Sequence, residues 1–93
     1  MDSNNDIAIG QVVKSRAGRD KGKIFLVINI INDENVLIID GDMRKLENPK
    51  QKKLKHLIVY NTVVSELSYR LENNIEINNA YIRKLLGPFN RCF

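Results

Sequence analysis

Cationic side chains and two glycines are concentrated in residues 14–23. Five cations lie there with a single acid, Asp20: Lys14, Arg16, Arg19, Lys21 and Lys23. Lys and Arg at this density suit the binding of a polyanion, because they replace the counterions that condense on a line of phosphates. Gly18 and Gly22 allow positive φ angles or a close approach of the backbone, so that nearby N–H groups can donate to phosphate oxygens. The segment therefore predicts contact with a nucleic acid.

Positive charge belongs to one half of the chain. The 93 residues carry 15 Lys and Arg against 11 Asp and Glu, a formal net charge of +4. Residues 14–55 hold 11 of these cations and 6 of the acids, a net charge of +5, with a second basic cluster at residues 50–55. Such an uneven distribution is typical of a nucleic-acid footprint. The predicted contact residues are Lys14, Arg16, Gly18, Arg19, Lys21, Gly22, Lys23, Arg44, Lys45, Lys50, Lys52, Lys53 and Lys55.

The composition is that of a small folded protein from a reducing compartment. Hydrophobic residues make up 43% and charged residues 28% of the chain, as in a globular rather than a disordered protein. The polar residues 1–6 do not resemble a signal peptide, and no apolar run is long enough to cross a membrane. A single cysteine, Cys92, excludes an intramolecular disulfide. We therefore expect one cytoplasmic domain without a membrane partner.

No arrangement of side chains predicts catalysis. The sequence contains no NTPase-type phosphate loop, no nucleophile with a neighbouring base and no cluster of metal ligands. Asp40 and Asp42 flank a glycine and are interpreted as turn residues, and His56 has no partner at metal-binding spacing. We expect a protein without catalytic residues, metal, cofactor or small-molecule substrate.

Apolar and β-branched residues predict five short strands joined by turns. The predicted strands cover residues 7–15, 24–31, 36–39, 43–46 and 56–60. Asp40-Gly41 predicts a tight hairpin between the third and fourth strands. Pro49 places residues 47–53 in a polar loop. Five short strands with tight turns favour a small barrel over two large sheets.

After residue 60 the apolar period changes from that of a strand to that of a helix. Apolar side chains recur at helical spacing from Val63 to Leu71, which predicts a helix that ends at Asn73-Asn74. A second helix is expected over Ala80–Leu86, with Gly87-Pro88 as its stop. The candidate N-terminal caps are Asn61 or Thr62 for the first helix and Asn78 or Asn79 for the second.

The basic segment resembles a known motif. Residues Ala17-Gly-Arg-Asp-Lys-Gly-Lys23, between Val12-Val13 and Phe25-Leu-Val-Ile, resemble the KOW motif of several ribosomal proteins and NusG-type transcription factors. The stretch from residue 7 to 58 is similar to small bacterial KOW-domain RNA-binding proteins, which themselves resemble large-subunit ribosomal proteins. The resemblance implies an SH3-like barrel, with ribosomal or other structured RNA as the partner. Phe25 stands where many ribosomal members have a further glycine, which favours a more apolar second strand.

The expected fold is mainly β with C-terminal α: a tail at residues 1–6, a five-stranded SH3-like barrel of KOW type at 7–60, and a helical extension at 61–93 packed on the barrel. We expect a non-enzymatic, ribosome-associated RNA-binding module. It would recognise phosphates and RNA shape, because neither basic loop contains an aromatic side chain for base stacking. Ribosomal proteins are candidate further partners. Two alternatives stay open: the basic loops are only a solvated surface, or the chain is a protein-interaction adaptor of translation or transcription. An adaptor would dock through the barrel or through the helix at Tyr81–Leu86.

Overall fold

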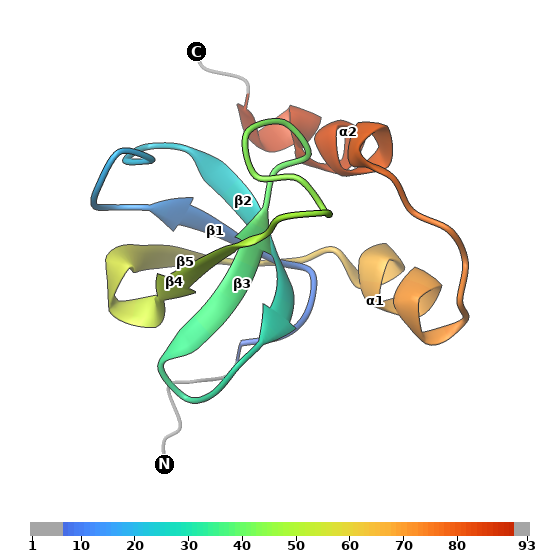
Figure 1. The fold of residues 1–93 in the computed structure, drawn as a ribbon, viewed down its shortest axis with the longest axis horizontal. Helices are drawn as coiled ribbons and strands as arrows, with labels where there is room; N and C mark the ends of the chain where they lie inside the picture. The colour runs from blue at the N-terminus through green and yellow to red at the C-terminus, as the bar shows by residue number, and fades with distance from the viewer. Residues whose placement is uncertain (1–6, 91–93) are drawn as a thin grey trace.

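The computed structural model of the chain describes residues 7–90 as a mainly β structure with two C-terminal helices (Figure 1). Five strands followed by two helices are confirmed at this level. The predicted tail at residues 1–6 and Cys92 lie outside the described residues. The elements are the strands β1 (Gln11–Ser15), β2 (Ile24–Ile30), β3 (Asn35–Ile39), β4 (Lys50–Lys53) and β5 (Leu57–Val63), the 3-10 helix η1 (Leu54–His56), and the α-helices α1 (Ser65–Glu72) and α2 (Asn79–Asn90).

The five strands form one antiparallel sheet in the order β4-β3-β2-β1-β5. β1 lies between β2 and β5, with Val13 opposite Phe25 of β2 and Val59 of β5. β4 and β5 are the edges of this sheet, so the ladder stays open across the described residues. The expected closed barrel is therefore not formed by hydrogen bonding.

Although open, the sheet is strongly coiled. β4 and β5 are joined only by the three residues of η1, each of which advances a 3-10 helix by about 2 Å. In a flat sheet of five strands the two edges would lie roughly 19 Å apart, too far for such a link. The Lys52 ammonium of β4 reaches the Ala17 carbonyl beyond the end of β1, at 3.0 Å. Coiling thus brings the β1–β2 loop and β4 together.

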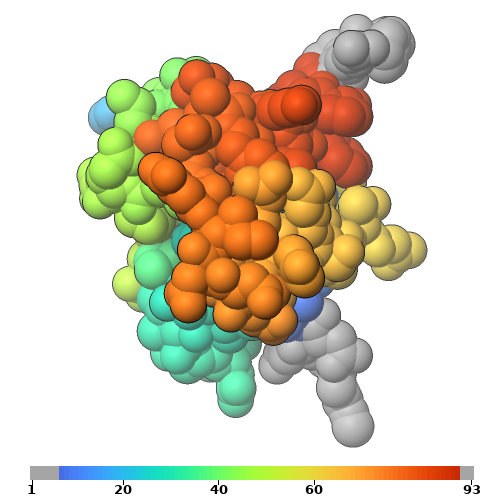
Figure 2. All heavy atoms as spheres, turned by 90° about the vertical axis from the view of Figure 1, so that its right-hand side faces the viewer, coloured from blue at the N-terminus to red at the C-terminus, as the bar shows by residue number. Residues whose placement is uncertain are grey.

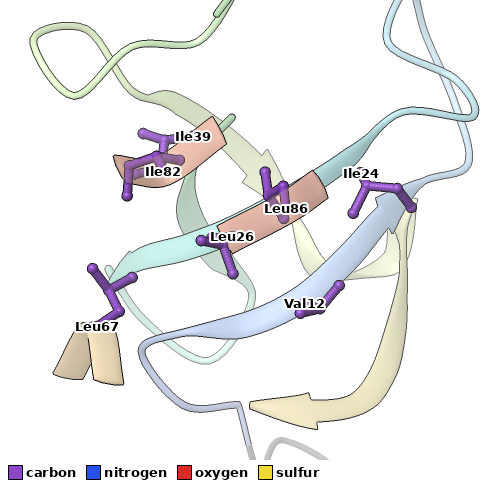
Figure 3. Close-up of a cluster of buried hydrophobic side chains, with 7 residues drawn as sticks. All are labelled: Val12, Ile24, Leu26, Ile39, Leu67, Ile82 and Leu86. Carbon is purple, nitrogen blue, oxygen red and sulfur yellow. The ribbon is translucent and has the colours of Figure 1, made fainter. Parts of the chain in front are cut away.

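Each face of the sheet carries its own apolar core. One core lies against the helices, where Leu67 of α1 and Ile82 and Leu86 of α2 meet side chains of β1, β2 and β3 (Figure 3). The other core lies on the concave face and consists of Val13, Phe25, Val27, Val36, Ile38 and Leu57. Because β2 contributes to both cores, it needs apolar side chains on both faces, which explains its nearly continuous apolar sequence.

The predicted fourth strand at residues 43–46 is wrong. Residues 40–49 form an irregular loop, and the fourth strand is β4, within the segment predicted as a polar loop. The Asp40 carboxylate accepts two backbone N–H groups in this loop, including that of Arg44 at 2.8 Å. These bonds close a turn, but residues 43–46 do not pair with β3, and β4 pairs with β3 only after this longer loop. Pro49 stands just before β4, where its missing N–H costs no ladder hydrogen bond.

Helix α2 holds the β3–β4 loop in this shape. The Asn79 side chain accepts the N–H of Leu46 at 2.9 Å and donates to the Glu47 carboxylate at 2.8 Å. The hydrogen bond from Asn79 lowers the pKa of Glu47. Arg83 donates to the Gly41 carbonyl at 2.6 Å. The loop therefore depends on a helix that is distant in the sequence, which no local pattern could reveal.

The start of α1 differs from the prediction. β5 continues beside β1 as far as Val63, so Asn61 and Thr62 are strand residues rather than helix caps. The residue at the cap position of α1 is Val64, which makes no side-chain capping bond. Pairing of β5 with β1 thus keeps Asn61 and Thr62 in the strand, although the local sequence predicts them as caps of the helix.

The limits of α2 are partly as predicted. Asn78 caps the helix, since its side-chain oxygen accepts the Tyr81 N–H at 2.8 Å. The helix does not stop at Gly87-Pro88 but continues to Asn90. Phe89 packs against the core on the helical face, and a proline in the last turn removes only one helical hydrogen bond. Packing therefore outweighs the local stop signal.

Candidate nucleic-acid interface

The β1–β2 loop, residues 16–23, is closed at its base by backbone hydrogen bonds. Ser15 donates to the Lys23 carbonyl at 2.9 Å, and Gly22 donates to the Ser15 carbonyl at 2.8 Å. Gly18 and Gly22 have φ angles of 81° and 89°, in the left-handed region where a side chain is strained. The prediction that these glycines supply positive φ is confirmed.

An ion pair between the buried Asp20 and the half-buried Arg44 joins the loop to the β3–β4 loop. Asp20 is only 3% exposed, and the Arg44 guanidinium lies 3.5 Å from its carboxylate. Arg44, predicted as a nucleic-acid contact, thus has a structural partner inside the protein. The sequence analysis missed this role of Asp20, although a lone acid within a basic loop is a signal for an internal pair.

The backbone donors of the loop fall into two groups. The N–H groups of Lys21, Gly22 and Lys23 bond to carbonyls of the loop and of β1, so they are not available to a phosphate. The N–H groups of Gly18 and Arg19 have no acceptor within residues 7–90. The phosphate donors expected around both glycines are therefore restricted to the Gly18 side of the loop.

Four exposed cations of the β1–β2 loop and one lysine of β4 form a single cationic surface, which we call the basic rim. The Lys52 ammonium donates to the Ala17 carbonyl at 3.0 Å and lies 3.5 Å from the position of a Cβ built on Gly18. This bond holds a cation of β4 at the tip of the loop. In Figure 1 the loop lies at the left, on the side away from α1. The basic rim comprises Arg16, Arg19, Lys21, Lys23 and Lys52.

The second predicted basic cluster is divided by the pleat of β4. Successive side chains of a strand point to opposite faces, so Lys52 and Lys53 diverge. Lys52 joins the basic rim, whereas Lys53 and Lys55 line a surface hollow together with Asp33 and Glu34. The two carboxyl groups offset the charge of these lysines. The structure therefore brings only part of residues 50–55 to the β1–β2 loop.

The remaining predicted contacts border the basic rim. Lys14 is half-buried on β1 opposite Ile24, and Lys50 is half-buried at the start of β4. Lys45 is exposed in the β3–β4 loop. The Lys23 ammonium lies 2.7 Å from the sulfur of Met43 in the same loop, so the two loops meet at the edge of the basic rim.

Two of the residues considered for metal binding take part in structural hydrogen bonds, Asp40 through its carboxylate and His56 through its backbone carbonyl. Asp40 closes the turn described above, and the His56 carbonyl accepts the N–H of Arg16 at 2.9 Å, which docks η1 beside the β1–β2 loop. Across residues 7–90, no three His, Cys, Asp or Glu side chains come together as a metal site. None of the helices in this part of the chain is long and apolar enough to span a membrane.

Helix α2 uses its apolar side chains in the core rather than as a docking face. Ile82 and Leu86 are 0% and 1% exposed and point toward the sheet (Figure 3). The Arg70 Cζ lies 4.3 Å from the centre of the Tyr81 ring. Burial raises the pKa of the Tyr81 phenol. The predicted docking segment 81–86 therefore offers a partner mainly polar side chains.

Comparison with known proteins gives one informative relative. No family model matches the chain. The chain is 30% identical over 73 residues to "Putative ribosome-binding protein YbzG" of Bacillus subtilis (strain 168), and the match covers 78% of this chain and 99% of that protein. Identity at this level over nearly the whole relative means that the chain belongs to the same family as YbzG.

Proposed function

We propose that the chain is a non-enzymatic, cytoplasmic RNA-binding protein of the ribosome, with an SH3-like fold of KOW type. The coiled five-stranded sheet and the three-residue link between β4 and β5 support the fold assignment. The Bacillus relative is named as a putative ribosome-binding protein, which supports ribosomal RNA as the ligand.

The basic rim is the observation that carries this proposal. Its loop exposes four cations, while its one acid, Asp20, is buried in an ion pair with Arg44. No exposed carboxylate of the loop therefore opposes an approaching phosphate. The backbone hydrogen bonds at the base of the loop and the Lys52 bond to Ala17 hold the backbone in place, so little conformational freedom is lost on binding.

Recognition is proposed to rest on phosphates and RNA shape. The guanidinium groups of Arg16 and Arg19 can bind a phosphate through two N–H groups at once, and the unpaired N–H groups of Gly18 and Arg19 add donors. The basic rim contains no aromatic side chain, and Phe25 at its border is fully buried. Base stacking therefore has no aromatic platform at this surface.

In-cell crosslinking to RNA, followed by sequencing of the bound fragments, tests the proposal. We expect enrichment of one segment of ribosomal RNA. Binding of that segment to the purified protein should weaken steeply with salt, because each neutralised phosphate releases counterions. Arg19→Glu and Lys21→Glu should each lower the affinity about tenfold and reduce the salt slope by about one.

Lys84→Glu is the matched control for these variants. It changes the net charge by the same amount on an exposed position of α2, so its affinity for the RNA should stay within about twofold of wild type. Crosslinking that yields no RNA above background, or equal losses in all three variants, would contradict the proposal.

A further inference from the structure

Helix α1 leaves large apolar side chains in solvent on the side of the molecule away from the basic rim. Only Leu67 of its eight residues is buried. Tyr69 is 59% exposed, Leu71 39%, and Ile75, just after the helix, 40%. Figure 2 shows α1 and the segment that follows it as the outer surface of this side. Large exposed apolar side chains gathered within one short segment are typical of a protein interaction site.

The segment that carries these apolar side chains has a net charge opposite to that of the basic rim. Residues 65–78 carry three glutamates and one cation, Arg70, for a net charge of −2. The Arg70 guanidinium is already engaged, because it pairs with Glu66 at 3.2 Å and lies over the Tyr81 ring. Glu72 and Glu76 are exposed, and their carboxylates have no cationic partner within residues 7–90. The exposed apolar side chains are thus bordered by uncompensated negative charge.

We propose that this surface binds a Lys- and Arg-rich segment of another protein that also carries apolar side chains. Cations of the partner would pair with Glu72 and Glu76, while its apolar side chains cover Tyr69 and its neighbours. RNA and anionic lipid are unsuitable ligands here, because both carry the same sign of charge as the surface. We call it the α1 face and define it by Tyr69 and Glu72, which lie three residues apart on one side of α1, together with Ile75 and Glu76 of the segment that follows the helix.

The location of the α1 face allows it to act together with the basic rim. In Figure 1, α1 lies at the right and the β1–β2 loop at the left, so one ligand need not displace the other. Proteins that neutralise RNA phosphates are rich in Lys and Arg, so neighbours of this chain on RNA would offer such segments. The inference itself rests on the α1 face alone and does not require that the basic rim binds RNA.

A titration of the isotope-labelled full chain, followed by amide chemical shifts, tests the inference. The probes are a short amphipathic peptide of Lys and Leu and its counterpart in which Glu replaces every Lys. We expect the cationic peptide to shift amides of residues 66–76 and to bind about tenfold or more tightly than the acidic peptide. Glu72→Lys/Glu76→Lys should weaken this binding by about tenfold or more.

Two further variants separate docking from general charge attraction. Asp33→Lys/Glu34→Lys makes the same change of charge in the exposed β2–β3 turn, and its affinity for the cationic peptide should stay within about twofold of wild type. Tyr69→Ala leaves the charge unchanged but should weaken binding about tenfold, since it removes an apolar anchor. The inference would be overturned if the amide shifts occurred outside residues 66–76 or if both peptides bound equally tightly. It would also be overturned if the two double variants lost the same affinity for the cationic peptide. Association of the chain with a second copy that is abolished by Glu72→Lys/Glu76→Lys would overturn the choice of partner.

Discussion

Single residues of the β1–β2 loop combine structural and electrostatic roles. Asp20 is an acid in a basic loop, yet its burial against Arg44 removes it from the surface that a phosphate would meet. Burying a carboxylate is costly unless it is paired, and Arg44 supplies the pair. The ion pair thus holds the loop against the β3–β4 loop, and the charged side chains that the loop exposes are all cations.

Glycines with the same backbone conformation differ in what surrounds them. Gly22 and Gly41 have φ angles of 89° and 78°. No atom lies within 4 Å of a Cβ built on Gly22, whereas a Cβ on Gly41 would lie 2.5 Å from the Asn79 carbonyl oxygen of α2. The first glycine is needed for its conformation alone, and the second for conformation and space.

Alanine substitution should separate these two requirements. Gly22→Ala should lower the free energy of unfolding by about 1–2 kcal/mol, the strain of a side chain at positive φ. Gly41→Ala should cost about 1–3 kcal/mol more, because α2 must also move away. Urea unfolding measures both values. Equal losses in the two variants would argue against tight packing of α2 on the β3–β4 loop.

At the scale of elements, β4 connects the two parts of the candidate site. Its side chains alternate between the faces of the sheet, so Lys52 reaches the β1–β2 loop while Lys53 lies beside Asp33 and Glu34. The Lys52 bond to Ala17 joins the edge strand β4 to the β1–β2 loop. Lys52 therefore positions the loop in addition to contributing charge.

Replacement of Lys52 should loosen the β1–β2 loop. In Lys52→Met the Ala17 carbonyl loses the donor from β4 and keeps only the Ser15 hydroxyl, which is local to the loop. Hydrogen exchange at the bonded amides of Lys21, Gly22 and Lys23 should therefore become about five- to tenfold faster. Lys53→Met is the control, because Lys53 has the same charge but makes no bond to the loop. Unchanged exchange in Lys52→Met would exclude a positioning role for this lysine.

At the scale of the whole molecule, strands and helices share one core. Leu67, Ile82 and Leu86 pack against the same sheet face as Val12 and Leu26. The basic rim and the α1 face, by contrast, carry charges of opposite sign and lie on different sides of the molecule (Figure 1). A shared core keeps these two surfaces in a fixed relation.

A core substitution in α2 should therefore destabilise the whole molecule. Leu86→Ala is expected to lower the free energy of unfolding by about 2–5 kcal/mol, since it leaves a cavity between helix and sheet. Helical circular dichroism and a probe in the strands should report one common transition. Lys84→Ala, on the exposed side of α2, should change stability by less than about 0.5 kcal/mol. Separate loss of the helices with an intact sheet would contradict a single cooperative unit.

The strand class, the basic loop and its two glycines could be predicted from the sequence because each has a local cause. β2 is predicted from a nearly continuous run of apolar residues, most of them β-branched or aromatic, and the loop from glycines between clustered cations. The cap at Asn78 is equally local, since its side chain bonds three residues along the chain. Such signals act over a few residues and do not depend on the rest of the fold.

Only the tertiary structure decided which of the predicted residues meet. The position of the fourth strand depends on α2 holding residues 40–49, the start of α1 on pairing of β5 with β1, and the end of α2 on Phe89 in the core. Coiling of the sheet brought Lys52 to the β1–β2 loop, and the pleat of β4 directed Lys53 elsewhere. These outcomes follow from contacts between segments far apart in sequence, whose free energies exceed the local preferences that a sequence displays.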